Sequence, residues 1–298
     1  MNITLKQLRY FVALAQDLHF GRAADRCAIS QPALSVQIRD LEDTLGLKLF
    51  ERQPRALRLT PHGDAFRERI RPILQSVDEL GDWVSSTRGS GFERLRLGII
   101  PTVAPYLLPN LISKLGQDNP SIDLHVRETV TPRLIDELLD GKLDAAIVAL
   151  PLNEPGLTEA PAFSEDMVLV RPDSEGAAPP ISVHELAAVR LLLLEEGHCF
   201  RDQALSFCNI NANRRREGLD GSSLGTLVQM VGAGIGVTLI PEMAIGVETR
   251  SAGVCINRFD DPAPSRTIGL VWRATHPMQS ALRDLVESVR HVGERSAE

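Results

Sequence analysis

The sequence predicts an α/β protein that begins with a winged helix-turn-helix and continues through a linker helix into a two-lobed body. Three observations predict it: helical patterns and a hairpin fill the first sixty residues, an apolar heptad seam follows, and strand and helix patterns then alternate to the end. We expect a winged helix-turn-helix domain at 1–60, a linker helix and hinge at 61–90, and the body at 91–298, with one lobe formed by 91–163 and 267–298 and the other by 164–266.

The first sixty residues have the pattern of a DNA-reading head. Helices are expected over 5–16 and 21–26. A third begins after Ser30 and ends at Gly46, because serine caps helix starts and glycine ends helices. Apolar residues at 4-3-4 spacing give this helix a buried stripe, and its opposite face presents side chains suited to base edges in the major groove. These are Gln31, Pro32, Ser35, Val36 and Arg39.

Residues 47–53 and 56–60 are typical of a hairpin, the wing. Arg52, Arg55 and Arg58 lie along it, where they can meet DNA phosphates. Residues 1–71 hold 12 Lys and Arg against 8 Asp and Glu, and residues 89–298 hold 19 against 28. A basic head before an acidic body is compatible with DNA binding. A plain three-helix bundle is the alternative.

A helix starting at Thr60-Pro61 carries an apolar seam at 4-3-4-3-4 spacing. The seam consists of Phe66, Ile70, Ile73, Val77, Leu80 and Val84. Such a seam pairs with a second copy, which would bring two heads to two half-sites on DNA. Alternatively, the helix packs only on its own domain. Pro72 predicts a bend in this helix.

In the body, strands are predicted over 94–100, 122–128, 144–150, 166–170, 191–195, 236–240, 253–258 and 267–273, with helices over 106–115, 133–140 and 278–292. The alternation predicts a mostly parallel sheet, and the stretch 151–161, rich in Pro and Gly, predicts a loop. Ligands of such sheets bind beyond the carboxyl ends of strands. Thr102, Thr131 and Gly197-His198-Cys199 follow strands, so we expect two hydroxyls and a cysteine to share one cleft.

Two cysteines of the body, Cys199 and Cys208, lie nine positions apart, and His198 and Arg201 flank the first. Nearby positive charge lowers the pKa of a cysteine and favours the reactive thiolate. In one continuous helix, nine steps rotate by about 180° and rise about 13.5 Å, whereas a disulfide needs Cα atoms about 4.4–6.8 Å apart. A disulfide between them would therefore break the helix and could carry a signal. Alternatively, both are buried small hydrophobes.

Composition excludes several classes of protein. No apolar run approaches the roughly 18–20 residues of a membrane span, and the N-terminal run 10–15 is too short for a signal peptide. We therefore expect a cytoplasmic protein. Four cysteines without C-x-x-C spacing predict no metal site, and no motif calls for a cofactor. The G-x-S-x-G match at 221–225 is interpreted as a helix start capped by Ser222 rather than a hydrolase elbow, because no strand pattern precedes it.

Several segments resemble LysR-type transcriptional regulators. Arg22-Ala23-Ala24, the run from Ser30 to Ser35, and the run from Leu41 to Arg52 match the head of that family. The stretches 98–103, 197–208 and 266–271 look like its hydrogen-peroxide-sensing members, and the pattern weakens over 209–219. The resemblance extends over essentially the whole chain. It implies a two-lobed effector domain similar to periplasmic binding proteins.

The resemblance also implies roles for single residues. Cys199 corresponds to the peroxide-reactive cysteine and Cys208 to its resolving partner. Thr102, Thr131 and His198 match positions that surround the peroxide, and Arg201, Asp202 and Arg266 match positions that tune the thiolate or the reduced packing.

We therefore expect a transcriptional regulator, not an enzyme, that senses hydrogen peroxide through a reversible Cys199–Cys208 disulfide and repositions the DNA-binding heads of a homodimer or homotetramer. Expected partners are double-stranded DNA at a pseudo-palindromic promoter site, thiol reductants such as glutaredoxin or thioredoxin, and RNA polymerase. Two alternatives stay open: a LysR-type regulator whose cleft binds a small metabolite, and a thiol peroxidase that uses the same cysteines.

Overall fold

The computed structural model describes residues 3–53, 56–86, 92–173, 186, 190–207 and 220–296. The chain divides into two compact units, Met1–Val84 and Ser85–Glu298, each with its own apolar core. The division falls inside the segment predicted to link head and body.

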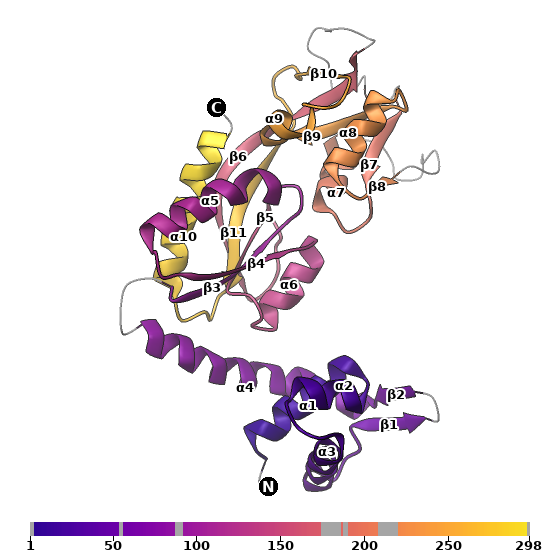
Figure 1. Cartoon of the computed structure of the whole chain (residues 1–298), viewed down its shortest axis with the longest axis vertical. Helices are drawn as coiled ribbons and strands as arrows, with labels where there is room; N and C mark the ends of the chain where they lie inside the picture. Colours follow the sequence, from indigo (N-terminus) through magenta and orange to yellow (C-terminus); the bar gives the residue numbers. More distant parts are fainter. Residues whose placement is uncertain are drawn as a thin grey trace. The chain divides into compact units, whose positions relative to one another are not determined.

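The first unit contains three helices and a hairpin: α1 (Leu5–Asp17), α2 (Phe20–Arg26), α3 (Gln31–Leu45), β1 (Phe50–Gln53) and β2 (Ala56–Leu59) (Figure 1). Ser30 caps α3 by accepting a hydrogen bond from the Ala33 amide, and Gly46 ends it in the left-handed conformation. The antiparallel pairing of β1 with β2 confirms the wing and rules out the plain three-helix bundle. The predicted turn at 54–55 lies outside the described residues.

Glu42 joins the end of α3 to the wing. Its buried carboxylate accepts hydrogen bonds from the amides of Leu49 (2.8 Å) and Phe50 (3.2 Å) through Oε1, and its Oε2 accepts from Lys48 Nζ at 2.9 Å. Two buried backbone donors that lie outside any helix are thereby satisfied, as buried donors need to be. Glu42 thus sets where the wing begins.

The linker helix α4 (Pro61–Ser86) continues through Pro72. Thr60 caps it by accepting from the Gly63 amide at 2.9 Å. Phe66 and Ile70 pack in the core of the head, so this part of the seam is used within the unit. Ile73 and Leu80 are 50% and 62% exposed, which leaves the later part available to a partner, and the side chain of Val84 lies outside the description. The bend at Pro72 stays a prediction.

The second unit is built on a nine-stranded sheet among the described residues, in the order β4-β3-β5-β11-β6-β9-β7-β8, with β10 pairing β6. Its strands are β3 (Arg94–Ile99), β4 (Asp123–Glu128), β5 (Ala145–Leu150), β6 (Leu157–Pro172), β7 (Leu191–Leu194), β8 (Asp220–Gly221), β9 (Val237–Pro241), β10 (Val254–Asn257) and β11 (Ser265–Arg273). Its helices are α5 (Ala104–Asp118), α6 (Thr131–Leu139), α7 (Cys199–Phe207), α8 (Leu224–Gly232), the short η4 (Glu242–Ala244), α9 (Ile245–Glu248) and α10 (Gln279–Ser296).

The prediction of a mostly parallel sheet was wrong. Among the described strands, four neighbouring pairs are parallel and four are antiparallel. The antiparallel pairs all involve β6 or β11, which run from one lobe into the other (Figure 1). The chain therefore passes between the lobes along strands. The lobe boundaries expected at 163/164 and 266/267 lie inside these two strands.

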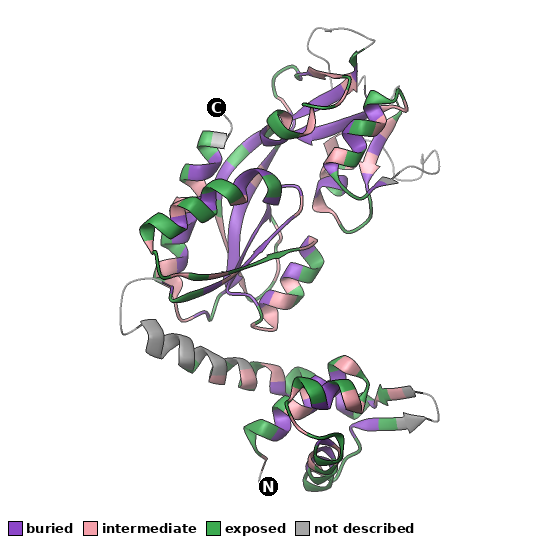
Figure 2. Cartoon of the chain, viewed as in Figure 1, coloured by how far each residue is buried: buried purple, intermediate pink, exposed green. Residues whose placement is uncertain are grey.

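The loop predicted over 151–161 was also wrong at its end, because β6 begins at Leu157. Pro161 is tolerated in this strand because the register with β11 shifts beside it: Phe163 pairs with Ile268 and Pro161 with Gly269, which leaves Ala162 as the extra residue of a bulge. The buried faces of β5, β6 and β11 form the centre of the unit (Figure 2).

Ser223, and not Ser222 as predicted, caps α8 by accepting a hydrogen bond from the Thr226 amide.

Within the described residues, no helix has both the length and the apolar character that a membrane crossing requires.

Replacing Glu42 with alanine should destabilise the head by about 2 kcal/mol or more, because two buried amides lose their acceptor. Hydrogen exchange at the amides of Leu49 and Phe50 should accelerate, and urea unfolding should shift to lower concentration. Asp43→Ala is the matched control, since Asp43 is exposed and lies 3.9 Å from Lys48. It should change stability by less than about 0.5 kcal/mol. Equal effects from the two substitutions would contradict the role given to Glu42.

Candidate functional site

Arg266 lies at the centre of the second unit, between the lobes. It faces Glu165 across β11 and β6, and the two side chains are 0% and 1% exposed. Its Nε and Nη2 both lie 2.8 Å from Glu165 Oε1. Its Nη1 donates to Thr102 Oγ1 at 2.9 Å, and Nη2 donates to the Thr102 carbonyl at 3.0 Å. Arg266 therefore ties the turn after β3 to both crossing strands.

Helix α7 begins at Cys199, a half-buried free cysteine, and packs against this arginine. The ring of the next residue, Phe200, is buried and lies 5.4 Å from the guanidinium carbon of Arg266, a cation–π contact. Arg201 is also buried and donates to the Leu194 carbonyl at the end of β7. Arg201 and Arg266, which were predicted to tune the thiolate or the reduced packing, thus both contact the segment around Cys199. Arg201 binds it to the end of β7, and Arg266 contacts the ring of Phe200.

Thr131, at the start of α6, is buried, and its hydroxyl has no hydrogen-bond partner among the described residues. The turn before Cys199 approaches it: Gly197 has a φ of +96°, and a Cβ placed on it would lie 3.9 Å from a methyl group of Val130. The structure therefore brings the turn at 197–199 to the start of α6. Through Arg266 and Phe200, it also links α7 to Thr102.

His198 is half-buried beside Cys199. Burial lowers the pKa of His198, and the nearby Glu195 carboxylate opposes this only in part. The lowered pKa favours the neutral imidazole, which can serve in hydrogen bonds but supplies no positive charge to the Cys199 thiolate.

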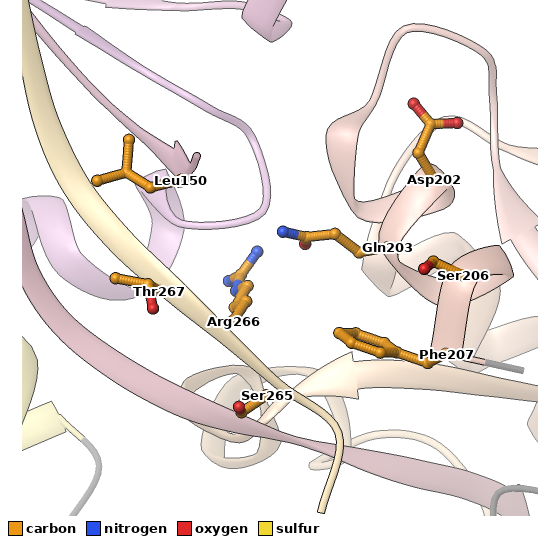
Figure 3. A pocket seen from close by; sticks show the side chains of 8 residues that line it. All are labelled: Leu150, Asp202, Gln203, Ser206, Phe207, Ser265, Arg266 and Thr267. Atoms are coloured by element: carbon orange, nitrogen blue, oxygen red, sulfur yellow. The ribbon is translucent and has the colours of Figure 1, made fainter. Parts of the chain in front are cut away.

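A cavity of about 430 Å³ lies between α7 and β11 (Figure 3). It is lined by Leu150, Asp202, Gln203, Ser206, Phe207, Ser265, Arg266 and Thr267. Gln203 extends from α7 toward the side of the cavity formed by β11, and its Oε1 is buried without a hydrogen-bond partner among the described residues. Gln203 was not among the residues predicted for the site. Its spacing of four from Cys199 could have indicated it, because residues four apart share a helix face.

In the head, Gln31, Pro32, Val36 and Arg39 of α3 are exposed, Ser35 is half-buried, and Arg58 of β2 is exposed. The predicted DNA-reading face is therefore accessible. Arg55 and Cys208 lie outside the described residues, as does the side chain of Arg52.

Comparison with known proteins adds to this geometry. The family description of a bacterial regulatory helix-turn-helix protein of the lysR family matches residues 5–64, and that of a LysR substrate binding domain matches residues 88–294. This chain belongs to the LysR family. The two-lobed regulatory fold with an N-terminal helix-turn-helix is thereby confirmed.

Individual relatives cover nearly the whole chain. The DNA-binding transcriptional dual regulator OxyR of Escherichia coli is 40% identical over 294 residues, which are 97% of this chain and 95% of that protein. A probable hydrogen peroxide-inducible genes activator of Streptomyces viridosporus is 41% identical over 297 residues, 96% of this chain and 93% of that protein.

Solved structures agree in fold with this LysR-family chain. A full-length OxyR variant from Pseudomonas aeruginosa matches with a TM-score of 0.76 at 38% identity, covering 97% of this chain and 98% of that one. A peroxide-bound OxyR variant from Corynebacterium glutamicum matches with a TM-score of 0.70 at 33% identity, covering 100% and 94%.

Replacing Thr131 with valine should leave stability unchanged or raise it by up to about 1 kcal/mol, because the hydroxyl that is removed bonds to none of the residues that the structure describes. The matched control is Thr238→Val. Thr238 is equally buried, but its hydroxyl donates to the Leu192 carbonyl at 3.0 Å, so this change should cost about 1 kcal/mol. Thermal unfolding of the two variants tests the contrast. A loss at Thr131 as large as that at Thr238 would show that its hydroxyl is engaged.

Proposed function

We propose that this LysR-family regulator senses hydrogen peroxide through Cys199 and converts the oxidation into altered DNA binding. The observation that carries the proposal is the site at the start of α7. A free cysteine begins the helix, and two buried oxygens that have no hydrogen-bond partner in the described part of the chain, on Thr131 and Gln203, lie on the elements around it. Buried polar atoms without partners are uncommon, and a small polar molecule such as peroxide would satisfy them. The peroxide-related names of the relatives support the same reading.

The chemistry proceeds in two steps. The Cys199 thiolate attacks one peroxide oxygen: a sulfur–oxygen bond forms, the oxygen–oxygen bond breaks, and the second oxygen leaves as hydroxide and takes up a proton. The Cys208 thiolate then attacks the sulfenic sulfur: the sulfur–sulfur bond forms, the sulfur–oxygen bond breaks, and the oxygen leaves as hydroxide, which takes up a proton to become water. A thiol reductant such as glutaredoxin or thioredoxin would return two electrons by thiol–disulfide exchange.

Oxidation would change the fold because α7 runs unbroken from Cys199 to Phe207, directly before Cys208. Helical spacing would hold two such cysteines about 13.5 Å apart along the axis, too far for a disulfide. Closing a loop of about ten residues supplies roughly 2.7 kcal/mol in the chain-entropy model, whereas a full switch needs about 5.5 kcal/mol. Bond chemistry and repacking must therefore contribute the rest.

The output would be a changed placement of paired heads on DNA. Exposed Ile73 and Leu80, with Val77 between them, form the part of the seam that can join two copies into a homodimer, and dimers could associate into a homotetramer. We propose that the assembly acts in the cytoplasm at a pseudo-palindromic promoter site, and that its heads contact double-stranded DNA while RNA polymerase is recruited or excluded. The proposed domains remain 1–60, 61–90 and 91–298.

A second candidate function is a LysR-type regulator that binds a small metabolite. The polar cavity between α7 and β11 favours it. In that case a metabolite would change the DNA footprint of a Cys199→Ser protein, and peroxide would not be needed.

Peroxide at low concentration should remove two of the four free thiols of the wild-type protein and change its DNA footprint. Cys199→Ser should abolish the change in footprint, and Cys208→Ser should stop at sulfenic acid. Cys255→Ser is the control, because this half-buried cysteine lies in β10, where it donates to the Pro172 carbonyl at 3.7 Å, and it should respond like wild type. The proposal fails if the Cys199→Ser protein still responds to peroxide.

In the head, Arg58→Ala should weaken binding to all DNA sequences alike and lower the salt slope of affinity by about one, because a single phosphate contact is lost. Gln31→Ala should instead relax sequence preference, costing about 1–3 kcal/mol on the preferred site. Fluorescence anisotropy over a salt series separates the two effects. Lys142→Ala, in the body, should change neither quantity.

A further inference from the structure

The hydroxyl of Thr102 is oriented by Arg266. Arginine carries only donors, so the bond from Arg266 Nη1 at 2.9 Å makes Thr102 Oγ1 an acceptor. The Thr102 carbonyl accepts from Nη2 at 3.0 Å, so the residue is held at two points. The hydroxyl proton therefore stays available to a partner other than Arg266. Within the part of the chain that the structure describes, no acceptor takes it.

Arg266 is in turn fixed by Glu165. Both contacts of the guanidinium with Glu165 Oε1 are 2.8 Å long and fully buried. The other carboxylate oxygen, Oε2, accepts from the Met243 amide of η4 at 3.3 Å. Since both oxygens of Glu165 are held, the guanidinium cannot rotate away from Thr102 without breaking charge-assisted hydrogen bonds.

We propose that Glu165 is a positioning residue for the oxidation of Cys199: by fixing Arg266, it directs the hydroxyl proton of Thr102 toward the peroxide oxygen that leaves. The inference rests on the proposed function. As the sulfur–oxygen bond forms and the oxygen–oxygen bond breaks, sulfur is oxidised and negative charge develops on the departing oxygen. A donor that is already oriented stabilises that charge without reorganisation. Glu165 itself touches neither sulfur nor peroxide.

A purely stabilising role explains the Glu165–Arg266 pair less well. Removing two ions from water costs several kcal/mol for each, and buried pairs often contribute no more stability than apolar residues of similar size. What the pair does provide is a single geometry for the guanidinium. The consequence of that geometry is the orientation of Thr102.

The test compares two reactions of Cys199 in the reduced full-length protein, followed by mass spectrometry of the peptide that contains it. Glu165→Gln should slow oxidation by hydrogen peroxide about tenfold, less than the 10²–10³ that loss of a whole donor costs. Alkylation by iodoacetamide should keep its wild-type rate, because the leaving iodide needs no hydroxyl donor. Glu242→Gln is the matched control: this carboxylate lies beside Met243 and pairs with the exposed Arg258, and both rates should stay unchanged.

A double-mutant cycle with Thr102→Val decides the route of the effect. If Glu165 acts through Thr102, adding Glu165→Gln to Thr102→Val should cause no further loss. Equal loss in both reactions, or additive loss in the cycle, would overturn the inference and leave peroxide sensing intact. If wild-type Cys199 reacts with peroxide no faster than Cys255, the proposed function itself fails. If Glu165→Gln does not fold, Glu165→Asp can replace it, because aspartate keeps the charge but is shorter by one methylene group. It too should slow oxidation by peroxide and leave alkylation unchanged.

Discussion

The buried ion pair between Glu165 and Arg266 is the interaction on which the centre of the regulatory unit depends. It exists only while β6 and β11 keep their register, because a slip of one residue would place the two charges on opposite faces of the sheet. Each charge would then be buried without its partner, at a cost of several kcal/mol. The ion pair therefore couples three features of the unit. If the register of β6 and β11 changed, the geometry between the lobes and the position of Thr102 would change with it.

A second bond between the lobes supports the same arrangement. Tyr106, in the first turn of α5, donates to Glu248 Oε1 of α9 at 2.7 Å, and burial together with this carboxylate raises the pKa of the phenol. Helix α7 has nine residues, a length at which helices are marginal without packing, and its buried side chains are Phe200, Arg201 and Ala204. We infer that α7 is the element able to change while the bonds between the lobes persist.

Much of this arrangement could be predicted from the sequence. Capping residues such as Ser30 and Gly46 give local hydrogen bonds, so they set the bounds of α3 wherever the helix packs. The approach of the 197–199 turn to the start of α6, where Thr131 lies, agrees with the rule that binding residues follow the carboxyl ends of strands.

Other features depend on tertiary pairing. Glu165 lies in a strand whose residues alternate in burial, and its partner Arg266 is 101 residues further along the chain. The sequence around Glu165 therefore did not indicate that this carboxylate is buried in an ion pair. The heptad seam predicted the apolar face of α4, but it did not show what this face packs against. Phe66 and Ile70 pack in the core of the head itself. Pro161 suggested a loop because the bulge that accommodates it is formed with β11.

The same unit holds a second buried carboxylate, Asp144, which stabilises the fold and lies away from the site around Cys199. Asp144 lies at the start of β5, opposite the carboxyl ends where Thr102 lies, and bonds Arg96 through both oxygens. Burial alone would raise its pKa, but the His276 imidazole 3.6 Å away, together with the hydrogen bonds and charge of Arg96, lowers it to about 2. A folded pKa below the unfolded value of about 3.9 means that the ionised group stabilises the fold above that pH, and that this contribution is lost as pH falls toward 2. Between pH 5 and 8 Asp144 therefore stays charged. Over that range titration of Asp144 therefore does not loosen the lobe that carries Thr102, whereas His198 lies directly beside Cys199.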